Sequence, residues 1–146
     1  MIRTIVAMVA VAVGVTAVLA QGEPLSERKA LMKKNNQHAK GLNSMVKGET
    51  PFNAAEADAA FTQWGATAAK FPDLFPENSK TGETRALPKI WESNADFRAK
   101  NAAFGKAVAD HKGKAKSLDG LKAAMPAVNK TCNDCHELYR AAAKKK

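Results

Sequence analysis

The residues best suited to chemistry lie close to the end of the chain, in the run Cys132-Asn133-Asp134-Cys135-His136. Covalent haem attachment requires this Cys-x-x-Cys-His spacing. Two thiols one helical turn apart can add to the two vinyl groups of a haem, and the imidazole beside the second cysteine then falls beneath the iron as its proximal ligand. Cys132 and Cys135 are the only cysteines in the sequence. We therefore predict one covalent haem c, attached through these two thiols, with His136 on the iron.

Three other interpretations of this motif remain open. A structural disulfide across two intervening residues is strained, and it would leave His136 without a role. A thioredoxin-like redox pair belongs in a βαβ setting, and no strand-like alternation of apolar residues surrounds the motif. A zinc site needs about four ligands, and only His38 and His111 remain as obvious further donors.

The beginning of the chain has the pattern of a secretory signal peptide, predicted over residues 1–20. Arg3 supplies a positive start, and an uncharged segment rich in Val and Ala follows and ends at Ala20 with residues that a signal peptidase accepts. Cleavage there would leave residues 21–146 as the mature domain, exported to the periplasm, and haem is attached to such cysteines outside the cytoplasm. The alternative is an uncleaved anchor, because residues 4–22 are uncharged and about 20 such residues span a bilayer. The absence of positive charge just after the segment favours cleavage.

The charge of the chain constrains its partners. The sequence has a net charge of +9, and a basic exported protein can bind anionic membranes, nucleic acid or acidic proteins. The predicted compartment argues against nucleic acid, and the lysines are spread along the chain instead of forming one block. We predict a redox protein as partner, an acidic one suiting the charge, and no stable membrane insertion after processing. Lys144 to Lys146 are interpreted as a solvated helix end, with docking to such a partner as the alternative.

Four segments show helical spacing of apolar residues. In the first, over about 24–47, Leu25, Met32, Ala39 and Val46 recur every seven residues, and Gly48 ends the stripe. The second begins at Asn53, a suitable N-cap with Glu56 three residues later, and stops at Phe71 because Pro72 cannot continue the ladder of hydrogen bonds. A loop through Gly82 leads to a third helix, predicted from Pro88 to His111.

The fourth segment carries the haem motif. Ser117 can cap it, and its apolar residues advance by alternating steps of three and four: Leu118, Leu121, Met125, Val128, Cys132, Cys135 and Tyr139. Both cysteines therefore lie on the buried stripe of a helix, and His136 projects close to the same face. Four amphipathic helices with short connections predict an all-α fold, a single antiparallel four-helix bundle.

With the haem motif near the end of a four-helix pattern, the chain closely resembles the cytochrome c prime family, which includes low-spin relatives of the c-556 type. The resemblance covers nearly all of residues 24–142. The segments on which the resemblance rests are Glu27-Arg28-Lys29-Ala30-Leu31-Met32, Val46-Lys47-Gly48-Glu49, Leu74-Phe75-Pro76, Ser79-Lys80-Thr81-Gly82, Leu87-Pro88-Lys89-Ile90-Trp91 and the run from Cys132 to Arg140. Several of these are weak alone, but their order and spacing together are specific.

The resemblance implies which other residues lie near the haem. The haem c would sit in the bundle core, and the first helix would cover its distal face. Arg28 and Lys29 would lie near the haem edge, and Glu83 and Thr84 match a loop that touches the haem in relatives. Arg140 matches a basic residue beside the proximal ligand. The alternative for each is a solvated surface group.

The resemblance also places Met32 at the position that faces the iron. In the c-556 type a methionine here binds the iron through sulfur and gives a six-coordinate, low-spin centre. In cytochromes c prime this position is usually apolar and the iron is five-coordinate, although some of these carry methionine too. Thioether ligation raises the reduction potential relative to histidine ligation. The alternative for Met32 is a core residue, since methionine fills gaps readily, and Met45, Met125 and His38 are interpreted as packed residues.

These observations lead to two functional hypotheses. The first is a periplasmic monohaem electron carrier with His136 and Met32 as axial ligands. The second is a five-coordinate cytochrome c prime that binds nitric oxide or carbon monoxide. We predict that the protein is not an enzyme, because a peroxidase would need a distal acid–base pair and only Arg28 offers a part of one. A further alternative is a haem-free structural bundle, in which the Cys-x-x-Cys-His run would have arisen by chance. The chain could be a monomer or a homodimer.

Overall fold

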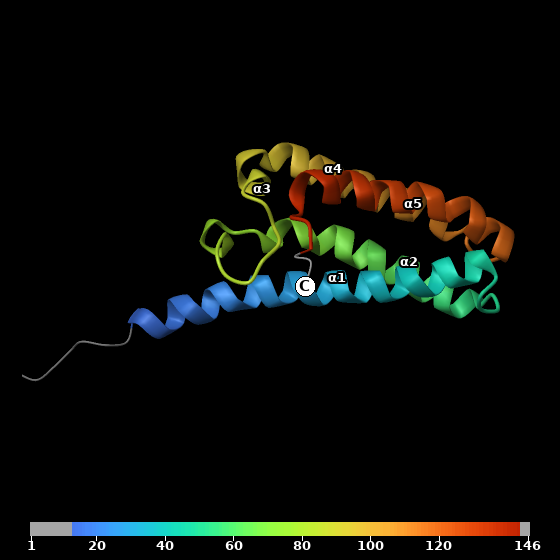
Figure 1. Ribbon diagram of the computed structural model, residues 1–146, viewed down its shortest axis with the longest axis horizontal. Coiled ribbons are helices and arrows are strands. Elements are labelled where there is room, and N and C mark those ends of the chain that lie inside the picture. The colour runs from blue at the N-terminus through green and yellow to red at the C-terminus, as the bar shows by residue number, and fades with distance from the viewer. Residues whose placement is uncertain (1–12, 144–146) are drawn as a thin grey trace, which may run out of the picture.

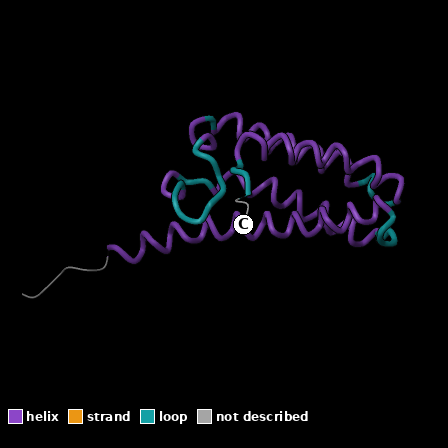
Figure 2. Tube along the Cα trace, in the orientation of Figure 1, coloured by secondary structure: helices purple, strands orange, loops and turns teal. Residues whose placement is uncertain are grey.

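The computed structural model describes residues 13–143, and these form an antiparallel bundle of four long helices (Figure 1). The long helices are α1 (Val13–Lys47), α2 (Ala54–Lys70), α4 (Asn94–Lys112) and α5 (Leu118–Tyr139), and α3 (Lys89–Glu92) is a single turn. Two short 3-10 helices, Phe71–Leu74 and Glu77–Ser79, precede α3. Figure 2 shows that the chain between α2 and α4 forms the longest loop, at the end of the bundle where α5 finishes. The prediction of an all-α four-helix bundle is confirmed.

Helix α1 begins earlier than predicted. It starts at Val13 and contains Pro24 in its interior, whereas Pro24 was expected in the first turn. Residues 13–23 include three valines, two glycines and a threonine beside Ala, Leu, Gln and Glu, so helix propensity does not explain this upstream extension, and the proline removes one of its hydrogen bonds. The predicted signal peptide falls mostly on residues 1–12, which lie outside the described residues. No helix within residues 13–143 combines the length and apolar character that crossing a bilayer demands.

The end of α1 and the start of α2 follow the prediction. Gly48 has a φ of +75°, a conformation that suits glycine because it has no Cβ. Its N–H donates to the Met45 carbonyl at 3.0 Å, which satisfies one of the last carbonyls of the helix. The Asn53 side chain accepts hydrogen bonds from the N–H groups of Ala55 and Glu56. Asn53 is therefore the N-cap of α2.

The prediction of one continuous third helix is wrong. Ser93, with φ −122° and ψ 47°, separates α3 from α4. The turn of α3 is held by its own contacts: Ile90 is buried, and the Trp91 indole donates to the Phe75 carbonyl at 2.9 Å. These contacts fix α3 against the preceding loop, and α4 then starts afresh with the Phe97 N–H bonding to the Ser93 carbonyl.

Helix α5 begins at its predicted cap and ends before the lysine tail. The Ser117 side chain accepts from the Gly120 N–H at 3.2 Å. A Cβ added at Gly120 would overlap the Lys114 carbonyl oxygen, so this turn needs a glycine. The helix ends at Tyr139, and residues 141–143 are not helical. Lys144 to Lys146, interpreted from the sequence as a solvated helix end, lie outside the described residues.

The buried side chains form two clusters. The larger contains Met45 and Met125, which are core residues as predicted, together with Trp64 and Val128. The smaller is mostly aromatic and contains Phe75, Phe97 and Tyr139 besides Leu74 and Ile90. Between the clusters the packing is interrupted by a cavity, and residues from both clusters line it. The fold therefore leaves one large gap in the core at the end of the bundle that carries the haem motif.

Candidate cofactor site

The cavity in the core brings all of the predicted site residues together. Its volume is about 660 Å³, which is in the range of sites for cofactors and other small molecules, roughly 300–1,000 Å³. Its lining includes Arg28, Lys29, Met32, Glu83, Thr84, Cys132, Cys135, His136 and Arg140. These residues come from α1, from the loop before α3 and from the end of α5, so only the tertiary fold unites them.

The two cysteines lie on one face of α5 and are half-buried. Both are free thiols, so the disulfide alternative does not describe this structure. Burial raises the pKa of Cys132 to about 11, with the neighbouring Cys135 as a further cause. Burial also raises the pKa of Cys135. The pair therefore presents two neutral thiols to a partly apolar cavity.

His136 follows directly and shares the cavity wall. Burial, together with the positive charges of Arg140 and Arg85, lowers the pKa of His136 to about 4. The imidazole is therefore neutral at pH 7, the form in which a ring nitrogen can bind a metal ion. His38 and His111 do not line the cavity, and residues 13–143 contain no group of three or more His, Cys, Asp and Glu side chains placed to hold a metal ion. The zinc alternative therefore lacks ligands in the described part of the chain.

Met32 lines the cavity from α1, on a different wall from the motif on α5. Its helix is fixed to α2 by contacts one turn further on. The Trp64 indole donates to the Asn35 carbonyl at 3.3 Å, and the Thr67 hydroxyl donates to the Asn35 side chain at 3.0 Å. Asn35 and Thr67 were not among the residues predicted from the sequence, although Thr67 lies three residues after Trp64 on the buried face of α2.

Arg28 is buried at the edge of the cavity, with 4% of its surface exposed. Its guanidinium donates to the Ser79 carbonyl at 3.0 Å and lies over the Phe75 ring, 4.5 Å from the centroid. The Nε–H is buried and has no hydrogen-bond partner among the described residues. An unpaired buried donor is costly, and a carboxylate in the cavity, such as a haem propionate, could satisfy it. The site therefore fits a group of this chemistry.

Lys29, Glu83 and Thr84 form the edge of the site beside Arg28. Lys29 Nζ and Glu83 Oε2 are 3.5 Å apart and join α1 to the loop before α3, but both side chains are largely exposed. Such an exposed pair contributes little stability. The Thr84 hydroxyl accepts from the Ala86 N–H at 3.0 Å, and Gly82 has a φ of +100°. The loop is thus shaped locally and presents polar groups to the cavity.

The same loop is fixed to the end of α5. An isolated antiparallel bridge pairs Ala86 with Arg140. The Leu87 N–H donates to the Tyr139 carbonyl at 3.0 Å, and the Ala141 N–H donates to the Arg85 carbonyl at 2.8 Å. These bonds bring Arg85 close enough to His136 for its charge to affect the pKa of the imidazole. Arg85 was not among the residues predicted from the sequence, because no local signal indicates a contact across more than fifty residues.

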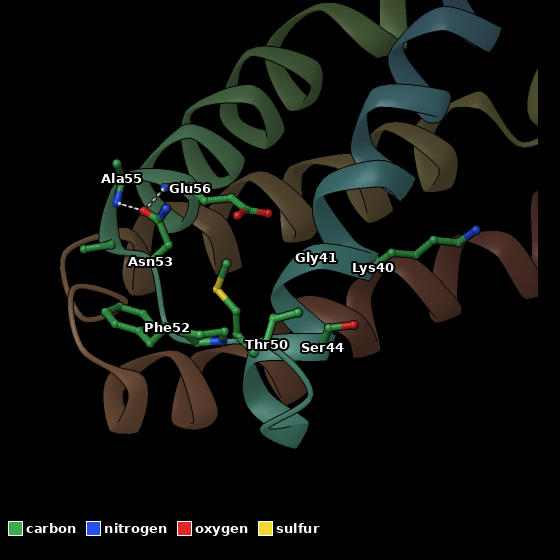
Figure 3. A pocket seen from close by; sticks show the side chains of 11 residues that line it. Lys40, Gly41, Ser44, Thr50, Phe52, Asn53, Ala55 and Glu56 are labelled. Carbon is green, nitrogen blue, oxygen red and sulfur yellow. Dashed lines mark hydrogen bonds between the residues drawn. The ribbon is translucent and has the colours of Figure 1, made fainter.

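A second cavity, more open to solvent, lies at the opposite end of the bundle, between the end of α1 and the start of α2. Figure 3 shows Lys40, Ser44, Thr50 and Glu56 around it, with Asn53 capping α2. Its lining contains neither cysteine nor histidine. The groups able to attach and bind a haem are therefore confined, within residues 13–143, to the cavity between the two core clusters.

Comparison with known proteins agrees with this geometry. The family model described as cytochrome c′ matches residues 23–140. The chain belongs to the cytochrome c′ family. A cytochrome c-556 from Rhodopseudomonas palustris is 39% identical over 145 residues, which cover 96% of this chain and 97% of that protein.

Two solved structures of the family show the same fold. The cytochrome c′ of Rhodopseudomonas palustris is 36% identical and aligns with a TM-score of 0.78 over 84% of this chain and 98% of its own. The oxidised cytochrome c556 of that organism is 37% identical, with a TM-score of 0.75 and the same coverage of both chains. Members of the cytochrome c′ family bind one covalent haem c, and this chain is accordingly a monohaem cytochrome.

Proposed function

We propose that the protein is an electron carrier whose haem c is attached through Cys132 and Cys135 and bound on the iron by His136 and Met32. The observation that carries this proposal is that Met32 on α1 lines the same cavity as the motif on α5. A thioether and a neutral imidazole from two different helices would keep the coordination number constant when an electron is gained or lost. Little would then have to reorganise, which suits rapid electron transfer.

The chain's own residues would hold the haem and set its environment. A haem c bound there supplies an iron that takes up and releases a single electron. The aromatic residues Phe75, Phe97 and Tyr139 exclude water from one side of the cavity, and Trp64 and Val128 do so from the other. The unpaired Nε–H of Arg28 would donate to a propionate, while Lys29, Glu83 and Thr84 would form the polar edge.

The proposal places the mature protein in the periplasm, as residues 21–146. Pro24 supports this processing, because a chain that starts at Gln21 would have Pro24 near its first helical turn, where proline is accommodated. In the full-length helix it is an interior residue that removes a hydrogen bond. We expect a redox protein as partner, with no role for nucleic acid, no stable insertion into the membrane and no enzymatic reaction.

Visible spectra of the oxidised and reduced protein, with and without carbon monoxide, test the proposal. Ligation by Met32 predicts a low-spin ferrous spectrum at neutral pH and slow binding of carbon monoxide. Replacing Met32 with Ala should give a high-spin ferrous protein that binds carbon monoxide rapidly. Met45→Leu is a matched control, because Met45 is buried in the larger core cluster and a volume-conserving exchange is tolerated. A wild-type protein with a high-spin ferrous spectrum would overturn the ligation.

The second candidate is a five-coordinate cytochrome c′ that binds nitric oxide or carbon monoxide. It is favoured by the near-equal likeness of this chain to solved structures of both kinds, a cytochrome c′ and a cytochrome c556. In this case Met32 would be part of the apolar wall, and Met32→Ala would leave the spectrum almost unchanged. Rapid carbon monoxide binding by the wild-type reduced protein would favour this candidate over the first.

A further inference from the structure

Positively charged side chains surround the opening of the cofactor cavity. Six cations line the cavity, Arg28, Lys29, Lys33, Arg85, Lys100 and Arg140, against one carboxylate, that of Glu83. Lys29, Lys33, Arg85 and Arg140 are also exposed to solvent. A side chain that both lines a cavity and meets solvent lies at its opening. We call these four residues the basic rim.

The fold brings these like charges together from distant parts of the sequence. Lys29 and Lys33 lie one turn apart on α1. Arg85 and Arg140 are brought close by the hydrogen bond from the Ala141 N–H to the Arg85 carbonyl and by the bridge between Ala86 and Arg140. The ion pair between Lys29 and Glu83 is the only one that involves a rim residue among the described residues. Like charges held close together repel one another, so the rim favours the approach of an anion.

The haem itself does not supply enough negative charge to balance the site. Its two propionates would offset two of the six cations, and Glu83 offsets one more. Three positive charges then remain in excess around the opening. A buried donor, Arg28 Nε, is already available to one propionate. Lys29 is paired with Glu83 and the Arg85 guanidinium donates to the Ala141 carbonyl, but the charges of Lys33, Arg85 and Arg140 are not paired with a carboxylate among the described residues and can attract charges from outside the protein.

We propose that the basic rim is the docking surface for an acidic redox protein, whose carboxylates pair with Lys33, Arg85 and Arg140. This inference rests on the proposed electron-carrier function. The reduced protein would give one electron to the redox centre of the partner, which would be reduced by it, while Lys33, Arg85 and Arg140 would hold the partner's carboxylates. A rim of one charge around a recess steers an oppositely charged partner to the place where the two centres approach most closely.

Electron transfer to small complexes of opposite charge tests where anions approach. The reduced holoprotein is mixed with hexacyanoferrate(III), which takes one electron and becomes hexacyanoferrate(II), or with the cationic tris(phenanthroline)cobalt(III), which becomes the cobalt(II) complex. Lys33→Glu should slow the first reaction about five-fold and accelerate the second. Because Lys33 is next to Met32 in the chain, an unchanged visible spectrum of Lys33→Glu verifies that the iron coordination is intact. Arg140→Gln is a second rim variant for the same measurement.

Lys122→Glu is the matched control because it makes the same change of charge at the far end of the bundle. Lys122 is exposed and lies eighteen residues before Arg140, a separation of about 27 Å at ~1.5 Å per residue. That separation exceeds the screening length of about 10 Å at 0.1 M salt. The control should therefore change both rates by less than about two-fold.

Binding of an acidic peptide gives a readout independent of electron transfer. Titration of the oxidised holoprotein with hexaglutamate should shift the backbone amide resonances next to Lys33, Arg85 and Arg140, and Lys33→Glu should weaken the affinity while Lys122→Glu does not.

Equal effects of the two variants would overturn the proposal, because net charge alone would then explain them. Binding to phosphatidylglycerol vesicles that depends on Lys33, without peptide binding, would overturn it in favour of a membrane surface. Slow reaction of the wild type with both complexes would overturn the electron-carrier function as well.

Discussion

The Thr67 hydroxyl on α2 donates a 3.0 Å hydrogen bond to the side-chain carbonyl of Asn35 on α1, three residues beyond Met32. Thr67 is fully buried, and it also accepts from the Gln63 amide at 3.1 Å. A buried polar pair between two otherwise apolar helix faces specifies how the helices are aligned, because any shift leaves both groups unpaired. This pair therefore fixes the turn of α1 that carries Met32 to the wall of the cavity.

Replacement of Thr67 by Val keeps the shape of the side chain and removes its hydroxyl. We expect the free energy of unfolding to fall by about 1 to 2 kcal/mol, since Asn35 and Gln63 each lose a buried partner. Urea unfolding of the holoprotein measures this loss, and Thr67→Ser, which keeps the hydroxyl, should lose less. If the methionine ligation depends on this alignment, Thr67→Val also increases the rate of carbon monoxide binding, whereas Thr67→Ser does not. A Val variant as stable as the wild type would contradict the role of the pair.

Arg28 should affect both stability and reduction potential. Arg28→Met removes the hydrogen bonds to Ser79 and leaves a buried carbonyl unpaired, so the free energy of unfolding should fall by about 1 to 2 kcal/mol. It also removes a positive charge beside the proposed haem position. A nearby cation favours the reduced form, which carries one positive charge fewer, so the reduction potential should fall. Redox titration of the holoprotein measures this change.

Arg28→Lys separates the two effects of this side chain. Lysine keeps the charge but cannot reproduce the planar set of donors that bonds Ser79 and stacks on Phe75. We therefore expect this variant to lose stability while its reduction potential stays closer to that of the wild type. If the reduction potential fell equally in Arg28→Met and Arg28→Lys, the loss of the guanidinium contacts, and not the loss of its charge, would be the cause of the fall.

Local signals in the sequence predicted the haem motif and the helix caps, whereas the family resemblance supplied the further candidates Met32, Arg28, Lys29, Glu83, Thr84 and Arg140. Cys132, Cys135 and His136 are adjacent in the chain, and Ser117 and Asn53 cap their helices through bonds to the next few residues. The break at Ser93 was not predicted, since it depends on the Trp91 indole reaching the carbonyl of Phe75, sixteen residues earlier. Arg85 and Asn35 were missed for the same reason. Their contacts arise only when distant segments meet.

Tyr139 should make the stability of the protein depend on alkaline pH. Its hydroxyl donates to Asp96, and burial, followed by this hydrogen bond and the charge of Asp96, raises the pKa of Tyr139 from 10.0 to about 12. Because the folded-state pKa lies above the ordinary value, folding favours the protonated phenol. The stabilisation is complete below pH 10 and is lost as the pH rises through 12. Unfolding free energies measured between pH 9 and 12 should fall more steeply for the wild type than for Tyr139→Phe. Parallel curves would contradict this assignment.

Gly120 should contribute to the stability of the bundle at the end away from the cofactor cavity, and its replacement should not affect the cofactor. In an exposed helix, exchange of glycine for alanine stabilises by up to about 1 kcal/mol, and helix propensity alone therefore predicts that Gly120→Ala is favourable. The structure predicts the opposite, because the added Cβ would overlap the backbone carbonyl of Lys114. That carbonyl cannot move as a flexible side chain would, so the turn before α5 must shift.

We expect Gly120→Ala to reduce the free energy of unfolding by about 1 to 3 kcal/mol, as overpacking does. The visible spectrum of the folded holoprotein should stay the same, since Gly120 lies sixteen residues before His136 and does not line the cavity. Gly113→Ala is the matched control, because a Cβ at Gly113 would meet no atom within 4 Å. Its stability should stay within about 0.5 kcal/mol of the wild type. A stabilised Gly120→Ala variant would show that Lys114 does not pack against this turn.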